Sequence, residues 1–167
     1  MMEMTVLKVR QAEVEDVEVI HRFSVKLAEF EGTPGAVVAS VETLARDGFG
    51  PEAAFRTLMA ELDGAPVGFA TYITQYSVWE GKGTLFLQDL WVEEEVRQQG
   101  VARALMQALA RECHAKGYSR IDLNVLDWNP ARRFYENLGC RHLDRSRPYR
   151  LQGGALARLA ETEPGTH

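Results

Sequence analysis

The turn before a long helical pattern presents backbone amides that no side chain caps. Apolar residues recur with a helical period over residues 101–113, and the segment before them reads RQQG, Arg97–Gly100. It contains no Ser, Thr, Asp or Asn, the residues that usually bond the free N–H groups of a first helical turn. Such a helix end carries a partial positive charge and binds anions. We therefore predict that a ligand phosphate replaces the cap, with Gly100 and Ala102 small enough for its close approach.

The residues of this turn also allow a plainer interpretation. Glycine-containing turns are common, and an ordinary strand-to-helix turn can leave its amides bonded to water. Glu93, Glu94 and Glu95 lie just upstream and would repel a phosphate unless their side chains point away. The phosphate prediction therefore depends on the rest of the chain.

A second feature is a polar pair inside an apolar strand. The run Thr84–Val92 is rich in large apolar residues and predicts a central strand buried on both faces, with Gln88 and Asp89 at its centre. Burying an unpaired amide or carboxylate is costly, so each side chain should have a partner. The partner is either a bulge or neighbouring loop, or a substrate amine that enters where the strands separate.

A third feature joins a helix start to a tyrosine. Asn129 suits a helix cap and Pro130 suits the first helical position, so a helix is predicted over Pro130–Leu138. Tyr135 lies on the apolar face of this helix, where periodicity alone makes it a core aromatic. A neutral phenol can also protonate a departing thiolate. A ring anchored in the core with its hydroxyl in a cleft satisfies both interpretations.

The elements that must position these residues follow one another as a mixed α/β fold. Strands are expected at Thr5–Arg10, Phe55–Leu62, Pro66–Tyr76, Thr84–Val92, Arg120–Leu126 and from Cys140 to about Leu151. Helices are expected at Val14–Phe30, around Ser40–Asp47, from Val101 onward, at Pro130–Leu138 and near Ala155–Ala160. The dipeptide Asp63-Gly64 is a hairpin signal. This order indicates a mixed, mostly antiparallel sheet with helices on both faces.

Composition narrows the classes of function. The 167 residues are 46% hydrophobic and 26% charged, as in one globular domain; residues 1–167 are therefore expected to form one domain, with a frayed tail at 161–167. The net charge of -5 argues against a nucleic-acid partner. No run has the length of a membrane-spanning helix and the start lacks a secretory signal, so a cytoplasmic protein without a membrane partner is expected.

Charge and cysteine placement add two expectations. Residues 1–50 carry nine acids and five bases, and residues 97–150 carry eleven bases and five acids. This asymmetry suits a cationic ligand in the first half and an anionic one in the second, although scattered surface charge would give the same counts. Cys113 and Cys140 lack the spacing of a metal site, so no metal is expected and both should be small buried hydrophobes.

Together these segments resemble the GNAT superfamily of acetyltransferases. The turn has the form Arg-x-x-Gly-x-Ala, and Asn129–Tyr135 is similar to a family segment that carries a CoA-contacting Asn and a general-acid Tyr. From about Thr5 to Ala160 the chain is similar to the spermidine/spermine and thialysine N-acetyltransferase group. The segments that carry this likeness are Leu27–Glu31, Asp47–Gly50, Val67–Ala70, Trp79–Lys82 and Leu87–Asp89.

The resemblance implies a function and a set of site residues. The function is acetyl-CoA-dependent transfer of an acetyl group to a primary amine of a small molecule (a diamine, a polyamine or a thialysine-like amino acid) by a homodimer. Tyr135 would be the proton donor. The acetyl-CoA contacts would be Leu90, Trp91, Val92, Arg97, Gln98, Gln99, Gly100, Val101, Ala102, Arg103, Asn129 and Arg132. The amine would be bound by Phe30, Glu31, Gln88 and Asp89.

Two departures from that group bear on the acceptor. Gln88 stands where the group has a glutamate, and an amide cannot act as a general base. Arg147 stands where the group has an acidic substrate contact. A smaller amine, or an amino acid whose carboxylate meets Arg147, is therefore favoured over a long polycation. The base is unassigned: Asp89 or Glu31 through water, or an amine that arrives neutral.

Two other functions stay open at this level. A protein or peptide N-acetyltransferase would need an open groove around Glu31 and Trp79. A catalytically silent acyl-CoA-binding regulator would explain the neutral Gln88, but not the presence of Tyr135. A nucleotide-binding module is disfavoured, because the chain has neither a Walker lysine nor a dinucleotide fingerprint.

Overall fold

The computed structural model describes residues 4–161 and residue 165. It falls into two compact units, the first ending at Asn124 and the second beginning at Val125. The single-domain expectation stays a prediction.

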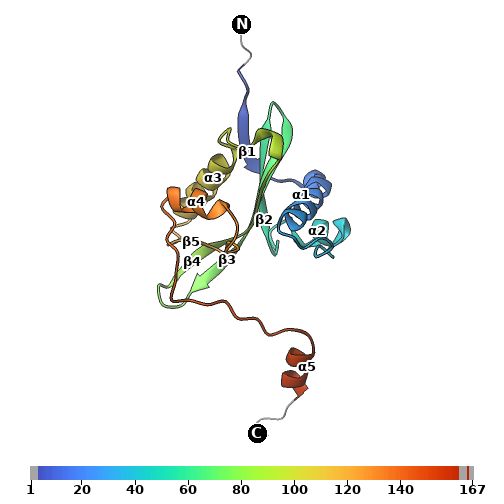
Figure 1. Cartoon of the computed structure of the whole chain (residues 1–167), viewed down its shortest axis with the longest axis vertical. Coiled ribbons are helices and arrows are strands. Elements are labelled where there is room, and N and C mark those ends of the chain that lie inside the picture. Colours follow the sequence, from blue (N-terminus) through green and yellow to red (C-terminus); the bar gives the residue numbers. More distant parts are fainter. Residues whose placement is uncertain (1–3, 162–164, 166–167) are drawn as a thin grey trace. The chain divides into compact units, whose positions relative to one another are not determined.

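The first unit is built on a five-stranded sheet (Figure 1). In the order β1-β2-β3-β4-β5 its strands are Leu7–Gln11, Arg56–Leu62, Ala65–Ser77, Lys82–Val92 and Ile121–Leu123. The first four are antiparallel to their neighbours, and β5 runs parallel to β4. This confirms the mixed, mostly antiparallel sheet. The predicted first strand lies one to two residues further along the chain, and β5 is shorter than predicted.

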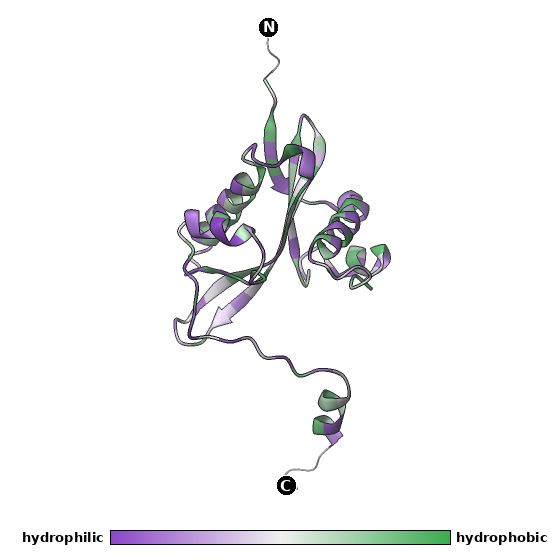
Figure 2. Ribbon diagram, in the orientation of Figure 1, coloured by the Kyte–Doolittle hydropathy of each residue, from purple (hydrophilic) through white to green (hydrophobic). Residues whose placement is uncertain are grey.

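Helices cover both faces of this sheet, as the amphipathic patterns predict. One face carries α1 (Val17–Phe30), which follows a 3-10 turn η1 (Val14–Asp16) and contacts α2 (Val41–Asp47); the other carries α3 (Val101–Ala115) (Figure 1). A further 3-10 turn, η2 (Glu94–Val96), leads from β4 toward α3. Polar and apolar residues alternate along α1 and α3 (Figure 2), because each helix buries only one side.

The β2–β3 hairpin turns at the predicted dipeptide. Asp63 has φ 50° and Gly64 has φ 82°, the two positive angles that a two-residue hairpin turn of the mirror-image type requires. The Asp63 carboxylate also accepts a hydrogen bond from the Val6 amide at 2.8 Å. The turn therefore sets the register of β2 and β3 and ties in the chain just before β1.

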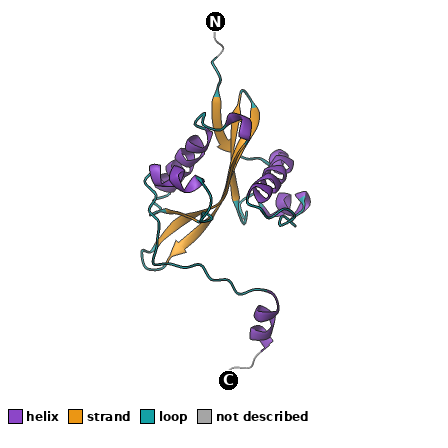
Figure 3. Ribbon diagram, in the orientation of Figure 1, coloured by secondary structure: helices purple, strands orange, loops and turns teal. Residues whose placement is uncertain are grey.

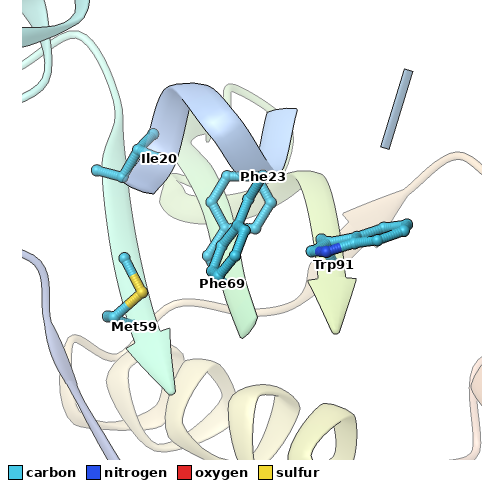
Figure 4. Packing of buried hydrophobic residues seen from close by; sticks show 5 residues of the cluster. All are labelled: Ile20, Phe23, Met59, Phe69 and Trp91. Carbon is cyan, nitrogen blue, oxygen red and sulfur yellow. The ribbon is translucent and has the colours of Figure 1, made fainter. Parts of the chain in front are cut away.

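The core between α1 and the sheet contains five large buried side chains (Figure 4): Ile20, Phe23, Met59, Phe69 and Trp91. Phe23 of α1 meets Phe69 of β3 edge to face, with ring centroids 5.6 Å apart. Such contacts let α1 lie close to β3 and β4. The end of α1 is thereby held beside the end of β4.

The second unit contains α4 (Ala131–Asn137) and α5 (Gly153–Glu161), which confirms both predicted helices within one to two residues. The predicted strand from Cys140 to about Leu151 is wrong, because the segment is a loop (Figure 3). Residues 141–152 are exposed to solvent. Four arginines and Pro148 interrupt its apolar residues, and proline has no N–H to donate to a neighbouring strand.

Two remaining expectations concern termini and membranes. Glu161 ends α5, and the rest of the expected frayed tail falls outside the described residues, apart from residue 165. None of the helices within residues 4–161 is long and apolar enough to cross a membrane.

Gly68→Ala is expected to destabilise the first unit. A Cβ atom at Gly68 would lie 2.7 Å from the Trp91 carbonyl oxygen and 3.3 Å from a methyl group of Val101, so β3 and β4 would have to move apart. We expect a loss of about 1–3 kcal/mol in the free energy of unfolding, measured by urea denaturation. Gly154→Ala in α5, where the methyl meets the end of Arg158, is the control and should change stability by less than about 1 kcal/mol. A loss at Gly68 no larger than the control would contradict the packing argument.

Candidate active site

The start of α3 has no side-chain cap, as predicted. Gly100 occupies the cap position with φ 83° and no side chain bonds the first turn, whereas Ser40 accepts the Thr43 amide at the start of α2. Gln98 is also left-handed, with φ 66°. A Cβ atom on Gly100 would meet nothing within 4 Å, so the backbone angle and not crowding requires glycine there. The glycine loop, residues 97–100, therefore leads into a helix end whose free amides are open to an anion.

The three glutamates before α3 repel an anion at the start of this helix less than their number suggests. Glu93 is paired with Lys26 of α1, whose Nζ lies 2.6 Å from one carboxylate oxygen and 2.9 Å from the other. Glu94 and Glu95 belong to η2 and are exposed to solvent. Pairing by Lys26 and screening by solvent weaken the repulsion that the three acids would otherwise exert.

The last half of β4 has one open side. Strand β5 pairs only with Leu85–Leu87, so within the described residues no strand lies beside Gln88–Val92 on that side. Glu93 donates its amide to the Val67 carbonyl oxygen at 2.8 Å, which means that its backbone groups face β3. Because these groups alternate along a strand, those of Trp91 also face β3, whereas those of Leu90 and Val92 face the open side. An extended amide-containing ligand can pair there as an added strand.

A bulge separates the two polar residues of β4. Leu87 lies opposite Tyr72 and Asp89 lies opposite Thr71, so Gln88 is an extra residue without a partner in β3. Gln88 is exposed, which corrects the expectation that the whole strand is buried on both faces. Asp89 is half-buried and accepts a hydrogen bond from the Thr71 hydroxyl at 2.7 Å. Thus Asp89 has the partner that its burial requires, and Gln88 needs none.

Asp89 and Glu31 form an acidic pair. Glu31 is the residue that ends α1, where the helix dipole is negative, and its side chain is half-buried. Burial raises the pKa of Glu31, and the charge of Asp89 raises it further. Burial also raises the pKa of Asp89, against the lowering effect of the Thr71 hydroxyl. Two half-buried carboxylates, one of which raises the pKa of the other, are complementary to a cation beside a negative helix end.

Aromatic side chains lie beside the acidic pair. Phe30 is 41% exposed and meets the buried ring of Trp91 edge to face, with centroids 6.1 Å apart. The guanidinium of Arg97 lies 4.8 Å from the Trp91 centroid and 5.4 Å from the Phe30 centroid. Of the predicted amine contacts, the structure therefore places Phe30 and Glu31 at the end of α1 and Gln88 and Asp89 at the bulge of β4. It directs the Trp91 side chain into the core and its backbone to β3, away from the open side.

In the second unit the Asn-Pro segment begins α4 as a turn. The Asn129 side-chain oxygen accepts a hydrogen bond from the Ala131 amide at 2.9 Å. The cap position itself is Pro130, one residue after the predicted cap Asn129. Arg132 donates to the Asp127 carbonyl oxygen at 3.1 Å. Tyr135 is 9% exposed. A hollow of about 390 Å³ is lined by Asp127, Asn129, Pro130, Arg132, Arg133 and Glu136.

Several features of the candidate site were not predicted from the sequence. Thr71 is the partner of Asp89, yet counting along the β3–β4 hairpin from its turn would place it opposite Gln88, because the bulge is not visible in the residue pattern. Nothing in the sequence indicates that Lys26 pairs with Glu93, which lies 67 positions further along the chain. Arg133 lines the hollow and could have been predicted, because it directly follows Arg132 in the sequence. Arg147 lies in the exposed loop of the second unit.

Comparison with known proteins shows the family to which the chain belongs. Residues 26–140 match the acetyltransferase (GNAT) family. A thialysine N-epsilon-acetyltransferase of Bos taurus is 34% identical over 169 residues, which cover 94% of this chain and 99% of the relative. A protein with the same name from Mus musculus is 35% identical over 165 residues, covering 92% and 96%.

A solved structure supports the fold alone. An integron cassette protein of V. cholerae superposes with a TM-score of 0.76 at 23% identity, covering 93% of this chain and 98% of that chain. The family match spans more than half of the chain, and the relatives are similar over nearly all of it. The chain belongs to the acetyltransferase (GNAT) family and is an N-acetyltransferase.

Proposed function

We propose that this protein transfers the acetyl group of acetyl-CoA directly to a primary amine of a small molecule, with a thialysine-like amino acid or a diamine as the acceptor class. The observation that carries the proposal is the acidic pair of Glu31 and Asp89 in the same unit as an uncapped helix end and an open strand edge. The acidic pair suits a cation. The helix end suits the phosphates of a CoA thioester, and the open strand edge suits its amides. The thialysine acetyltransferases among the relatives support the choice of acceptor.

Acetyl-CoA would be bound mainly by backbone groups. In this proposal the amides of Gln98–Arg103 hold the pyrophosphate, while the backbone of Leu90 and the amide of Val92 pair with the pantetheine arm. The Val92 carbonyl oxygen already accepts a hydrogen bond from Arg97. Asn129 and Arg132 provide further contacts; the Asn129 amide nitrogen is the part of that side chain not used to start α4. A thioester fixed in this way meets the amine at high effective concentration, which supplies much of the rate.

The acidic pair would bind the amine and help it lose a proton. An alkylammonium group has a pKa near 10 and cannot attack a thioester until it is deprotonated. Asp89 or Glu31, acting through water, is a candidate base, and an amine that arrives neutral is the alternative. Gln88 has no basic group and can contribute only hydrogen bonds. Should the acceptor carry a carboxylate, Arg147 is the predicted contact for it.

Tyr135 would complete the reaction. Attack of the neutral amine on the thioester carbonyl expels a thiolate, and a phenol protonates this leaving group without first being ionised. A backbone amide at the open edge of β4 would stabilise the negative oxygen of the tetrahedral intermediate. No covalent intermediate on the protein is required.

We also propose a cytoplasmic homodimer. The second unit exposes large apolar side chains between residues 143 and 159, of which Tyr149 is 93% exposed and Leu159 is 63% exposed. Exposed apolar side chains of this kind are available to pack against another chain. A second copy of this protein is the proposed partner.

An acceptor screen tests the proposed function. Release of free CoA from acetyl-CoA is measured with thialysine, lysine, a diamine, spermidine and lysine-containing peptides. We expect the highest kcat/KM with thialysine or the diamine, since two carboxylates match one or two cationic groups. Turnover of peptides alone would favour a protein acetyltransferase. Binding of CoA without turnover of any amine would contradict the proposal.

Tyr135→Phe is expected to lower kcat sharply. Loss of a general acid typically costs about 10²–10⁴-fold in rate, whereas the ring and its packing are kept. The Kd for CoA, measured by calorimetry, should stay within about twofold because the proposed CoA contacts are unchanged. Tyr76→Phe removes an exposed phenol of β3 and serves as the control. Unchanged turnover in Tyr135→Phe would remove Tyr135 from the mechanism.

Asp89→Asn is expected to alter the pH dependence of amine use. The raised pKa values of the pair mean that its negative charge is lost as the pH falls through them, so kcat/KM for the amine should fall on the acidic side. Without the charge of Asp89 the pKa of Glu31 decreases, and the acidic limb should move to lower pH while the amine KM rises at neutral pH. Glu42→Gln, at an exposed position of α2, is the control. If the acidic side of the pH profile of kcat/KM is the same in Asp89→Asn as in wild type, the pair does not bind the amine.

A further inference from the structure

The backbone and the side chain of Arg97 lie in different environments. Its backbone follows η2 and begins the glycine loop, with φ -62° and ψ 153°. Its side chain is directed to two other elements, the end of β4 and the end of α1. An arginine that served only as a phosphate ligand would present its planar fork to the anion.

Three contacts fix this side chain. Nε donates to the Val92 carbonyl oxygen at 3.0 Å, and the guanidinium lies over the rings of Trp91 and Phe30 at 4.8 and 5.4 Å. The indole N–H of Trp91 is buried and bonds to no partner within the described residues. Packing against the surrounding rings and Arg97, with no hydrogen bond to that N–H, holds the indole in place.

We propose that Arg97 is a positioning residue for acetyl-CoA: its side chain anchors the glycine loop on Trp91 and Phe30, and the loop amides bind the phosphates. This inference rests on the proposed function, because it assigns the phosphates to the helix end. A loop held in its binding conformation loses less freedom when the ligand arrives, so the anchor raises affinity without touching the ligand. Phe30 thereby contributes to CoA affinity although it is a predicted amine contact.

A double-mutant cycle between Arg97 and Phe30 tests this anchor. The Kd for CoA is measured by calorimetry in the full chain without an amine, for wild type, Arg97→Gln, Phe30→Leu and the double variant. We expect Phe30→Leu to weaken CoA binding about threefold to tenfold in the wild-type background and by less than about twofold in the Arg97→Gln background, as for two residues in contact. Additive effects would overturn the proposal.

Arg97→Lys separates anchoring from charge. Lysine keeps the positive charge but has neither the Nε donor nor the planar group that lies on the rings. We expect Arg97→Lys to weaken CoA binding to within about twofold of Arg97→Gln, with the salt dependence of the Kd equal to that of wild type in both variants. Wild-type affinity in Arg97→Lys, or a shallower salt dependence in Arg97→Gln, would show that Arg97 binds phosphate by its charge.

The controls distinguish this inference from the function on which it rests. Arg111→Gln removes an exposed cation from the far half of α3 and should leave the Kd for CoA unchanged. Melting temperatures of all variants identify any general loss of folding. If the wild-type protein does not bind CoA, the proposed function fails; if it binds CoA and the cycle is additive, only the role of Arg97 fails.

Discussion

Unsatisfied backbone hydrogen-bonding groups are the constraint on which this structure depends. Buried or half-buried N–H and C=O groups need partners, and folded proteins leave few of them without one. Here β5 stops after Leu123 and α3 begins without a cap, so β4 and the helix that follows it present donors and acceptors together. The family's acyl-CoA substrates carry both amides and phosphates, which are the groups such a region can pair.

The acidic pair opposes folding at the pH at which it would be useful. Because the pKa values of Glu31 and Asp89 are raised above their unfolded values, the pair disfavours the folded state most when both are ionised. That penalty declines as the pH falls through the raised values. The buried cluster of Phe23, Phe69 and Trp91 lies along the same helix and strands, and burial of these apolar side chains favours the folded state. Sites that bind ligands often carry such local costs.

Local signals were readable in the sequence, and non-local ones were not. Asp63-Gly64 predicts its own turn, because few residue pairs accept two positive φ angles. The missing cap before Val101 follows from the four residues Arg97–Gly100 alone, since none of them is a capping residue. The predicted strand after Cys140 failed because a run with scattered apolar residues has no intrinsic strand signal strong enough to replace a pairing partner. The stack of Arg97 on Phe30 joins positions that only the packing of α1 on β4 brings together.

The extra residue in β4 has a consequence for how this enzyme can change over generations. Gln88 has no partner in β3 and its side chain is exposed, so replacing it disturbs neither the strand pairing nor the core. Its neighbour Asp89 is tied to Thr71 and is far less replaceable. Single substitutions at Gln88, including one to an acid, can therefore change the charge and shape of the surface at this point of β4 while the scaffold beneath stays the same.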